Sequence, residues 1–247
     1  MNTRSASPSD AVNPEAFAQA EHPGSSPPAV STTWRIIAAG ELVLAGVTVI
    51  FDVWVPTLIL LALATASLGV RRQWPSTLGL VKPEGRRWWP LEILGFAVVW
   101  TLVTIGLTIP ALEHLTGQRQ DVSQFTVVQG NLGLLVLLLV ISWTLAAIGE
   151  EVAYRGFLLT RLQQVIGGGR ASATATVAAA VLAALLFGSA HNEQGVIGMA
   201  TTCIDALFFT WLRLRYRSLW VAVLAHGFNN TIGLIAYFLV GPIYGLW

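Results

Sequence analysis

One stretch of the chain decides its fold. Residues 132–164 read LGLLVLLLVISWTLAAIGEEVAYRGFLLTRLQQ, an apolar run that carries Glu150, Glu151 and Arg155 in its second half. A run of this length exceeds the ~20 helical residues that cross a bilayer core of ~30 Å. Charged groups inside such a run cost ~3 kcal/mol each on insertion scales, so they indicate a functional site in a membrane protein.

The composition of the whole chain agrees with a lipid environment. Of the 247 residues, 54% are hydrophobic and 11% are charged, which is about half the charged fraction of a soluble domain. The formal net charge of +1 says little by itself, and we expect no nucleic-acid partner. Cys203 is the single cysteine, which excludes an internal disulfide and a cysteine-based zinc site.

Six further apolar runs flank this stretch, so we expect an all-α, polytopic membrane helical bundle. The predicted transmembrane helices span residues 35–52, 54–70, 90–111, 132–164, 171–191, 195–213 and 218–240. The last run contains Gly233, where a break would give eight spans in place of seven.

The chain divides into three predicted regions. Residues 1–33 are rich in Ser, Pro, Ala and Thr without an apolar period, which predicts a disordered tail. Residues 34–130 are predicted to form N-terminal transmembrane helices without a chemical motif. Residues 131–247 hold the polar motifs and are predicted to form the catalytic transmembrane domain.

Basic residues gather in alternate connections of the predicted bundle. They are Arg71, Arg72, Lys82, Arg86, Arg87, Arg161, Arg170, Arg213, Arg215 and Arg217. Counting the spans places all these connections on one side of the membrane, which the positive-inside rule identifies as the cytoplasm. The N-terminus is therefore predicted to be cytoplasmic.

Glu151 and Arg155 are four residues apart, so helical spacing puts them on one face and within reach of an ion pair. The pair either only permits the helix in lipid or also supports a site at Glu150, and spacing alone leaves both interpretations open. Glu150 points about 100° away around the helix. It is therefore left for a partner on another helix.

His191 is a candidate partner for Glu150, because the two helices form a hairpin through the turn at Gly168. At ~1.5 Å per residue, Glu150 lies roughly 27 Å and His191 roughly 35 Å from this turn. His226 and Asn230 are four residues apart and share a face of the last helix. Either histidine taken alone is more often structural than catalytic.

Three polar signatures thus follow one another on successive spans: Glu150-Glu151-x-x-x-Arg155, Phe187-x-x-x-His191 and His226-x-x-x-Asn230. In this order they resemble the CPBP family of CAAX proteases and bacteriocin-processing enzymes, also called the Abi family. Its eukaryotic relatives are the type II CAAX prenyl endopeptidases. The resemblance covers residues 130–240 and implies an intramembrane endopeptidase of a kind often described as a metalloprotease.

The resemblance implies a role for each motif residue. Glu150 would be the general base that activates water together with His191, and His226 and Asn230 would stabilise the oxyanion. Glu151 and Arg155 would pair and support the helix. The family's metalloprotease description keeps zinc as an alternative, with ligands from Glu150, His191 and His226, although water activation without metal is the preferred interpretation. Asp205 lies outside the motifs, and we expect it to be a buried hydrogen-bonding partner.

The expected substrate is a membrane-embedded or lipid-anchored peptide or protein in the bilayer, and the expected location is the plasma membrane of a bacterium. Two other functions compete with proteolysis. An ion-coupled transporter would show inverted repeats with broken helices, whereas the charged positions here lie only in the second half of the chain. A non-catalytic membrane immunity or scaffold protein would use the same helices without chemistry.

Overall fold

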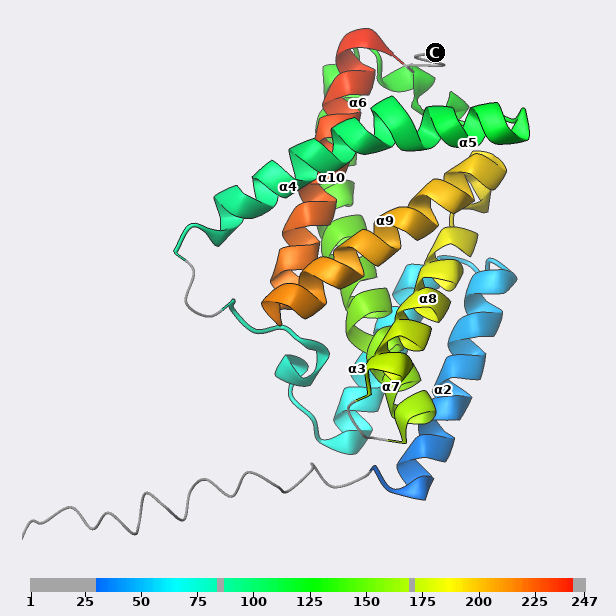
Figure 1. Cartoon of the computed structure of the whole chain (residues 1–247), viewed down its shortest axis with the longest axis vertical. Coiled ribbons are helices and arrows are strands. Elements are labelled where there is room, and N and C mark those ends of the chain that lie inside the picture. Colours follow the sequence, from blue (N-terminus) through cyan, green and yellow to red (C-terminus); the bar gives the residue numbers. More distant parts are fainter. Residues whose placement is uncertain (1–29, 84–86, 169–171, 242–247) are drawn as a thin grey trace, which may run out of the picture.

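The computed structural model describes residues 30–83, 87–168 and 172–241, which are helical apart from their connections (Figure 1). The α-helices are α2 (Thr32–Ile50), α3 (Pro56–Arg71), α4 (Trp89–Val103), α5 (Ile109–Thr116), α6 (Leu132–Ile141), α7 (Leu159–Gly167), α8 (Ala173–Ser189), α9 (Gly195–Tyr216) and α10 (Leu219–Val240). Two π-helical segments, Thr104–Thr108 and Ser142–Leu158, join α4 to α5 and α6 to α7. Single 3-10 turns cover Pro75–Leu78, Ser123–Val128 and Asn192–Gln194.

Each of the seven predicted runs forms one continuous helix, because α4–α5 and α6–α7 are joined without a break. In the described residues, five continuous helices are long and apolar enough to cross a membrane: Thr32–Ile50, Trp89–Thr116, Leu132–Gly167, Asn192–Tyr216 and Leu219–Val240. The apolar helices α3 and α8 are shorter. These findings confirm the predicted polytopic helical bundle, and α10 runs unbroken through Gly233, so the alternative of eight spans has no counterpart in the described ranges.

The predicted tail lies outside the described residues as far as position 29. The Ser31 hydroxyl accepts a hydrogen bond from the Trp34 N–H at 3.4 Å, which satisfies one of the free donors at the start of a helix. As a result α2 begins at Thr32 and includes the last two residues of the predicted tail.

The helix that carries the acidic pair is unusual in its middle. It runs for 36 residues, Leu132–Gly167, and 17 of them, Ser142–Leu158, have π-helical hydrogen bonding. π-helical turns are rare and occur frequently at functional sites. Here the segment holds Glu150, Glu151 and Arg155.

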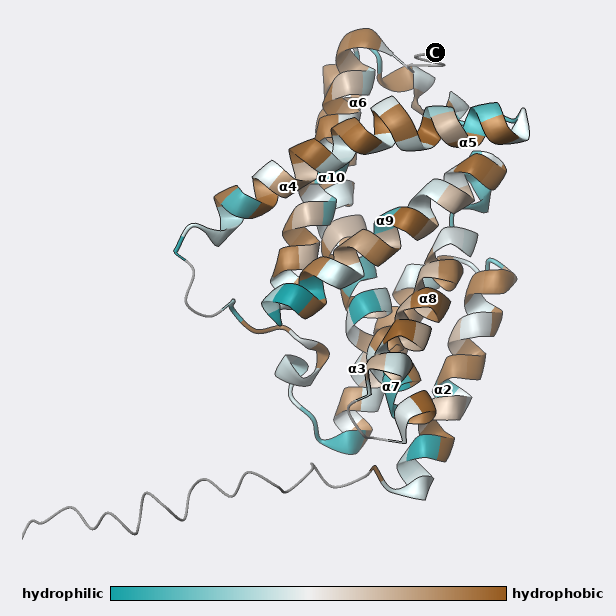
Figure 2. Ribbon diagram, in the orientation of Figure 1, coloured by the Kyte–Doolittle hydropathy of each residue, from teal (hydrophilic) through white to brown (hydrophobic). Residues whose placement is uncertain are grey.

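Small residues bring the helices close together in the largest buried cluster. This cluster joins α2, α3, α7, α8, α9 and the π-helical segment, and its alanines are Ala45, Ala153, Ala179, Ala183, Ala184 and Ala206. Small side chains let membrane helices approach closely, which replaces the hydrophobic driving force that lipid cannot supply. Figure 2 shows the complementary pattern, with hydrophobic colour along most helix lengths and hydrophilic colour nearer many helix ends.

The connection between α3 and α4 docks on the turn between α9 and α10. The Arg213 guanidinium donates to the Leu78 carbonyl at 3.1 Å, and the Leu219 N–H donates to the Gly79 carbonyl at 2.7 Å. These contacts close one end of the bundle beneath the polar residues of α10.

Gly227 on α10 packs directly against the Trp143 side chain of the π-helical segment. A Cβ at this position would lie 2.5 Å from the Trp143 ring, and this ring is held by a hydrogen bond from its Nε1 to the Thr231 hydroxyl at 3.1 Å. We expect Gly227→Ala to lower the free energy of unfolding by about 1–3 kcal/mol, because the core is overpacked. Gly233→Ala on the same helix is the control, since a Cβ there meets nothing within 4 Å. Equal unfolding midpoints for both variants in detergent would contradict the close packing of Gly227 against Trp143.

Candidate active site

Glu151 connects the first and the third polar motif. Its Oε1 atom lies 3.2 Å from Nη1 of Arg155 and 2.9 Å from Nδ1 of His226, and its side chain is fully buried. The ion pair predicted from helical spacing is therefore present. Because a carboxylate only accepts hydrogen bonds, Nδ1 of His226 carries the proton in this contact. Glu151 thereby fixes the orientation of an imidazole that lies 75 residues further along the chain.

Two aromatic rings enclose the buried cation of Arg155. Its guanidinium carbon lies 4.0 Å from the ring centroid of Phe187 on α8 and 5.7 Å from that of Phe209 on α9. Cation–π contacts of this kind strengthen when water is excluded. Phe209 also stacks on His226, with centroids 5.2 Å apart and an interplanar angle of 15°. Phe187, the phenylalanine of the second motif, meets the His226 ring edge-on with centroids 6.1 Å apart, so each of the two phenylalanines contacts both polar partners of Glu151.

Glu150 points toward the other side of His226. Its Oε2 atom lies 4.0 Å from Nε2 of that imidazole, and this oxygen is buried with no hydrogen-bond partner among the described residues. The two neighbouring glutamates therefore face the two nitrogens of one ring. The sequence led us to expect His191 as the partner of Glu150. The imidazole that lies 4.0 Å from Glu150 is His226, and His191 lines the same cavity.

His191 lies two residues after the end of α8, where the chain turns toward α9. Its Nδ1 lies 2.9 Å from the Phe187 carbonyl, and since a carbonyl can only accept, Nδ1 is the protonated nitrogen. A neutral His191 therefore keeps Nε2 as an acceptor. Its ring also lies against Phe187, with centroids 4.8 Å apart.

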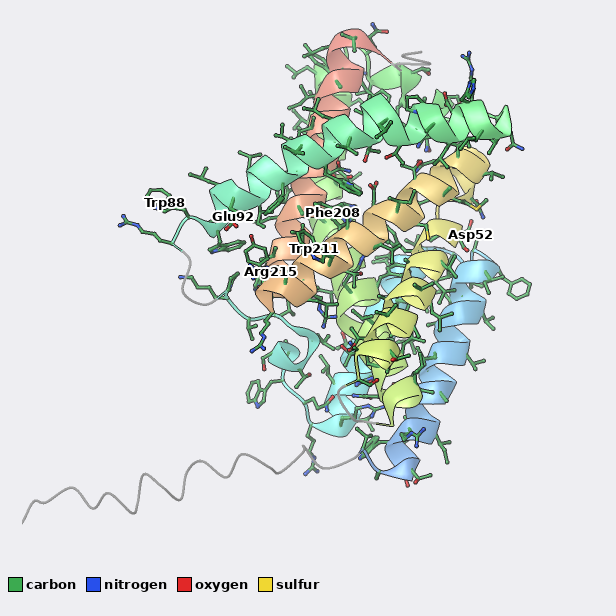
Figure 3. All side chains as sticks on the ribbon, viewed as in Figure 1. Asp52, Trp88, Glu92, Phe208, Trp211 and Arg215 are labelled. Atoms are coloured by element: carbon green, nitrogen blue, oxygen red, sulfur yellow. The ribbon has the colours of Figure 1, made fainter. Side chains whose placement is uncertain are left out.

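One cavity of about 440 Å³ brings the four predicted working residues together: Glu150, His191, His226 and Asn230. Asp205 also lines it, and Asp205 accepts a hydrogen bond from Trp100 Nε1 at 2.7 Å. The expected hydrogen bond of Asp205 to a neighbouring helix is thus present. Figure 3 shows α4 running alongside α9, the helix that carries Phe208, and Trp100 stacks on Phe208 with centroids 4.1 Å apart.

Several polar residues of the cavity carried no signal in the sequence. Asn229 accepts a hydrogen bond from the Thr101 hydroxyl at 2.7 Å, which ties α4 to α10. Thr104 and Ser142 each begin a π-helical segment, line the cavity, and have buried hydroxyls without a partner in the described chain. Serine and threonine in apolar runs are common and usually bond to their own helix, so spacing could not single these two out.

The residues present do not fit the zinc alternative. Among the described side chains, no three of His, Cys, Asp or Glu gather as a metal site requires.

Comparison with known proteins bears on the segment that holds all three motifs. Residues 132–232 match the family model described as "Type II CAAX prenyl endopeptidase Rce1-like". The curated proteins and the solved structures provide no significant match. The apolar helices are those of an integral membrane protein, and the match confirms the resemblance predicted from the motifs: residues 132–232 are similar to the Rce1-like domain of type II CAAX prenyl endopeptidases.

Proposed function

We propose that this protein is an endopeptidase that hydrolyses a peptide bond of a membrane-associated protein or peptide, with Glu150 as the general base. One observation carries the proposal. The unpartnered Oε2 of Glu150 lies 4.0 Å from Nε2 of His226, at a cavity that His191 and Asn230 also line. A base with a free lone pair beside a second proton-transfer group is what activation of water requires.

The separation of 4.0 Å between Glu150 Oε2 and His226 Nε2 is too long for a direct hydrogen bond but suits a bridging water. Two hydrogen bonds of ~2.8 Å from one water oxygen span this distance when they meet at about 90°. In the proposed reaction, Glu150 removes a proton from this water while the water oxygen bonds to the carbonyl carbon of the substrate. The proton then passes to the leaving amine as the C–N bond breaks.

His226 has the second proposed role, and Glu151 and Arg155 support it. The Nδ1–H of His226 donates to Glu151 at 2.9 Å, so Nε2 faces the cavity. When this imidazole is protonated, Nε2–H can donate to the oxyanion that forms on the substrate. Asn230 lies one helical turn further along α10 and lines the same cavity, so its amide is the second proposed donor. Each such donor is worth ~3 kcal/mol in the transition state.

The neutral form of His191 accepts at Nε2 because its Nδ1–H is bonded to the Phe187 carbonyl. We assign it the second contact with the attacking water or with the leaving amine. It lies just after α8, next to the turn at Asn192–Gln194, and lines the cavity together with Glu150 and His226.

Peptide hydrolysis by this arrangement should not require a metal. We expect the purified protein to keep its activity after dialysis against EDTA and to contain far less than one zinc per chain. Elemental analysis of the active protein measures the content directly. If the protein contains one zinc per chain, and if its activity is lost on chelation and restored by zinc alone, then Glu150 is a zinc ligand and not the general base.

The hydroxyls of Thr104 and Ser142 should contribute to binding of the substrate backbone, because both are buried at the cavity without an intramolecular partner. We expect Thr104→Val and Ser142→Ala each to raise KM by roughly 3- to 10-fold with little change in kcat, corresponding to about 1 kcal/mol per hydrogen bond. Thr144→Val is the control, since its exposed hydroxyl bonds to the Val140 carbonyl of its own helix. A fall in kcat with constant KM would assign these hydroxyls to another step.

The proposal is tested by comparing cleavage products of wild-type protein and Glu150→Gln. Each is reconstituted in liposomes with membrane proteins from the source cells, and new peptide termini are identified by mass spectrometry. Peptide termini that wild-type protein produces and Glu150→Gln does not produce support an endopeptidase. The inactive variant can also be used to trap the same substrates in uncleaved form. If both proteins give identical termini while the variant keeps its effect in cells, the non-catalytic alternative is correct.

A further inference from the structure

Contacts between distant segments define two ends of the bundle. At one end, the Arg35 guanidinium donates to the Val165 carbonyl at 3.1 Å, which joins the start of α2 to the end of α7. Arg161 of α7 donates to the Gln73 side chain at 3.4 Å, just beyond α3. Together with the docking of the α3–α4 connection on the α9–α10 turn, these contacts gather every second connection of the chain at this end.

The remaining connections meet at the opposite end. The Gln194 carbonyl, between α8 and α9, accepts a hydrogen bond at 3.0 Å from the N–H of Asp121, which lies between α5 and α6. The Phe238 carbonyl near the end of α10 accepts one from the Gly130 N–H, also at 3.0 Å. In Figure 1 the start of α2 lies at the bottom of the bundle and the start of α4 at its left edge, whereas the end of α5 and the start of α9 lie toward the upper right.

The two ends differ sharply in charge. In the described residues, the first end holds nine cations and two carboxylates, and we call it the arginine-rich end: Arg35, Arg71, Arg72, Lys82, Arg87, Arg161, Arg213, Arg215 and Arg217, with Glu41 and Glu92. The opposite end holds Asp52, Glu113, Asp121 and Glu193, and we call it the acidic end. Among the described residues, Arg119 is the basic side chain of the Lys or Arg type at this end. Figure 3 labels one marker of each: Arg215 near the end of α9, and Asp52 at the turn after α2.

The cavity opens at the acidic end. Its lining includes Gln120 and Gln124 from the α5–α6 connection and Glu193 and Gln194 from the turn before α9, and of these Gln124 and Glu193 are exposed. The opposite boundary is formed by buried groups, including His226 and Phe209. The residues that line the cavity include none from the arginine-rich end.

Lysine and arginine are retained on the cytoplasmic side of membrane proteins. We infer that the active-site cavity opens on the extracytoplasmic face, and that its substrate is a membrane-anchored polypeptide that presents the scissile bond from that face. This inference rests on the proposed peptidase function and narrows its substrate class. A lipid-modified C-terminus that stays in the cytoplasm would face the closed, arginine-rich end.

Two single-cysteine variants report which end of the protein faces the outside of the cell. In a Cys203→Ala background, which removes the single native thiol, Gln124→Cys marks the cavity mouth and Arg215→Cys marks the arginine-rich end. Intact cells are treated with a membrane-impermeant maleimide. We expect Gln124→Cys to react at once and Arg215→Cys to react only after the membrane is permeabilised. Reaction of Arg215→Cys alone, or of both cysteines in intact cells, overturns the inference.

The side of substrate access is measured in proteoliposomes that the same two cysteines have shown to be uniformly oriented. A quenched-fluorescent peptide library is added outside the vesicles only. We expect hydrolysis at least 10-fold faster when the Gln124 side faces outward than when the Arg215 side does. Faster hydrolysis from the Arg215 side overturns the substrate class but leaves the peptidase function standing. If no hydrolysis depends on Glu150, both the peptidase function and the substrate class are wrong. The orientation of the protein is then still given by the cysteine labelling.

Discussion

Glu150→Gln is expected to lower kcat for peptide hydrolysis by about 10³-fold, since general bases contribute roughly 10²- to 10⁴-fold. The amide has nearly the same shape as the carboxylate, but it cannot take a proton from water. The substitution also removes a buried oxygen that has no hydrogen-bond partner in the described residues. For that reason we expect the variant to fold at least as stably as wild type and to bind substrate with an unchanged KM or Kd.

The matched control is Asp121→Asn, the same acid-to-amide change at an exposed residue that does not line the cavity. It should retain wild-type kcat. Initial rates with a fluorogenic peptide and unfolding midpoints in detergent separate chemistry from folding. If Glu150→Gln keeps more than about a tenth of the wild-type kcat, Glu150 is not the base, and Asp205 becomes the next carboxylate at the cavity to test.

Arg155→Leu is expected to have the largest effect on stability. Arg155 and Glu151 are both almost completely buried and lie 3.2 Å apart, and removal of one partner of a buried ion pair costs about 3–5 kcal/mol because the other charge is left uncompensated. The arginine also loses its contacts with the rings of Phe187 and Phe209. Thermal or denaturant unfolding in detergent measures the loss, and Arg215→Leu, an exposed position, should change stability by less than about 0.5 kcal/mol.

A double variant separates stability from orientation of the imidazole. Glu151→Leu combined with Arg155→Leu removes both buried charges, so we expect it to recover more than half of the stability that Arg155→Leu loses. Its hydrolysis rate should stay low, because Nδ1 of His226 no longer has the carboxylate that fixes the ring. Recovery of both stability and rate would show that the ion pair acts only as a structural support.

The sequence predicted those parts of the fold that depend on local chemistry. Length and apolarity located each helix, since a stretch of this kind has no other stable form in lipid. Spacing along one helix also predicted the contact between Glu151 and Arg155, because residues four apart on a helix share a face. The π-helical hydrogen bonding of Ser142–Leu158 was not predicted, as neither composition nor apolar period distinguishes it from an α-helix.

Contacts between helices were the part that spacing could not supply. Depth along the hairpin placed His191 near Glu150 but gave no rotation about the helix axes, and the histidine measured beside both glutamates is His226. The partner of Asp205 is Trp100, 105 residues earlier in the chain. Such a pairing depends on how α4 packs against α9. This packing cannot be predicted from a local sequence pattern.

The position of His226 between the two glutamates has a consequence for biosynthesis. The glutamates belong to the fourth helix of the described chain, whereas His226 and Asn230 belong to α10, the last one described. The proposed site therefore cannot exist while α10 is still being made or inserted. In a partly synthesised molecule, Glu150 is present without the imidazole of His226. Proteolysis should therefore start only when the whole bundle is assembled, and other proteins being inserted into the same membrane should not be cleaved before then.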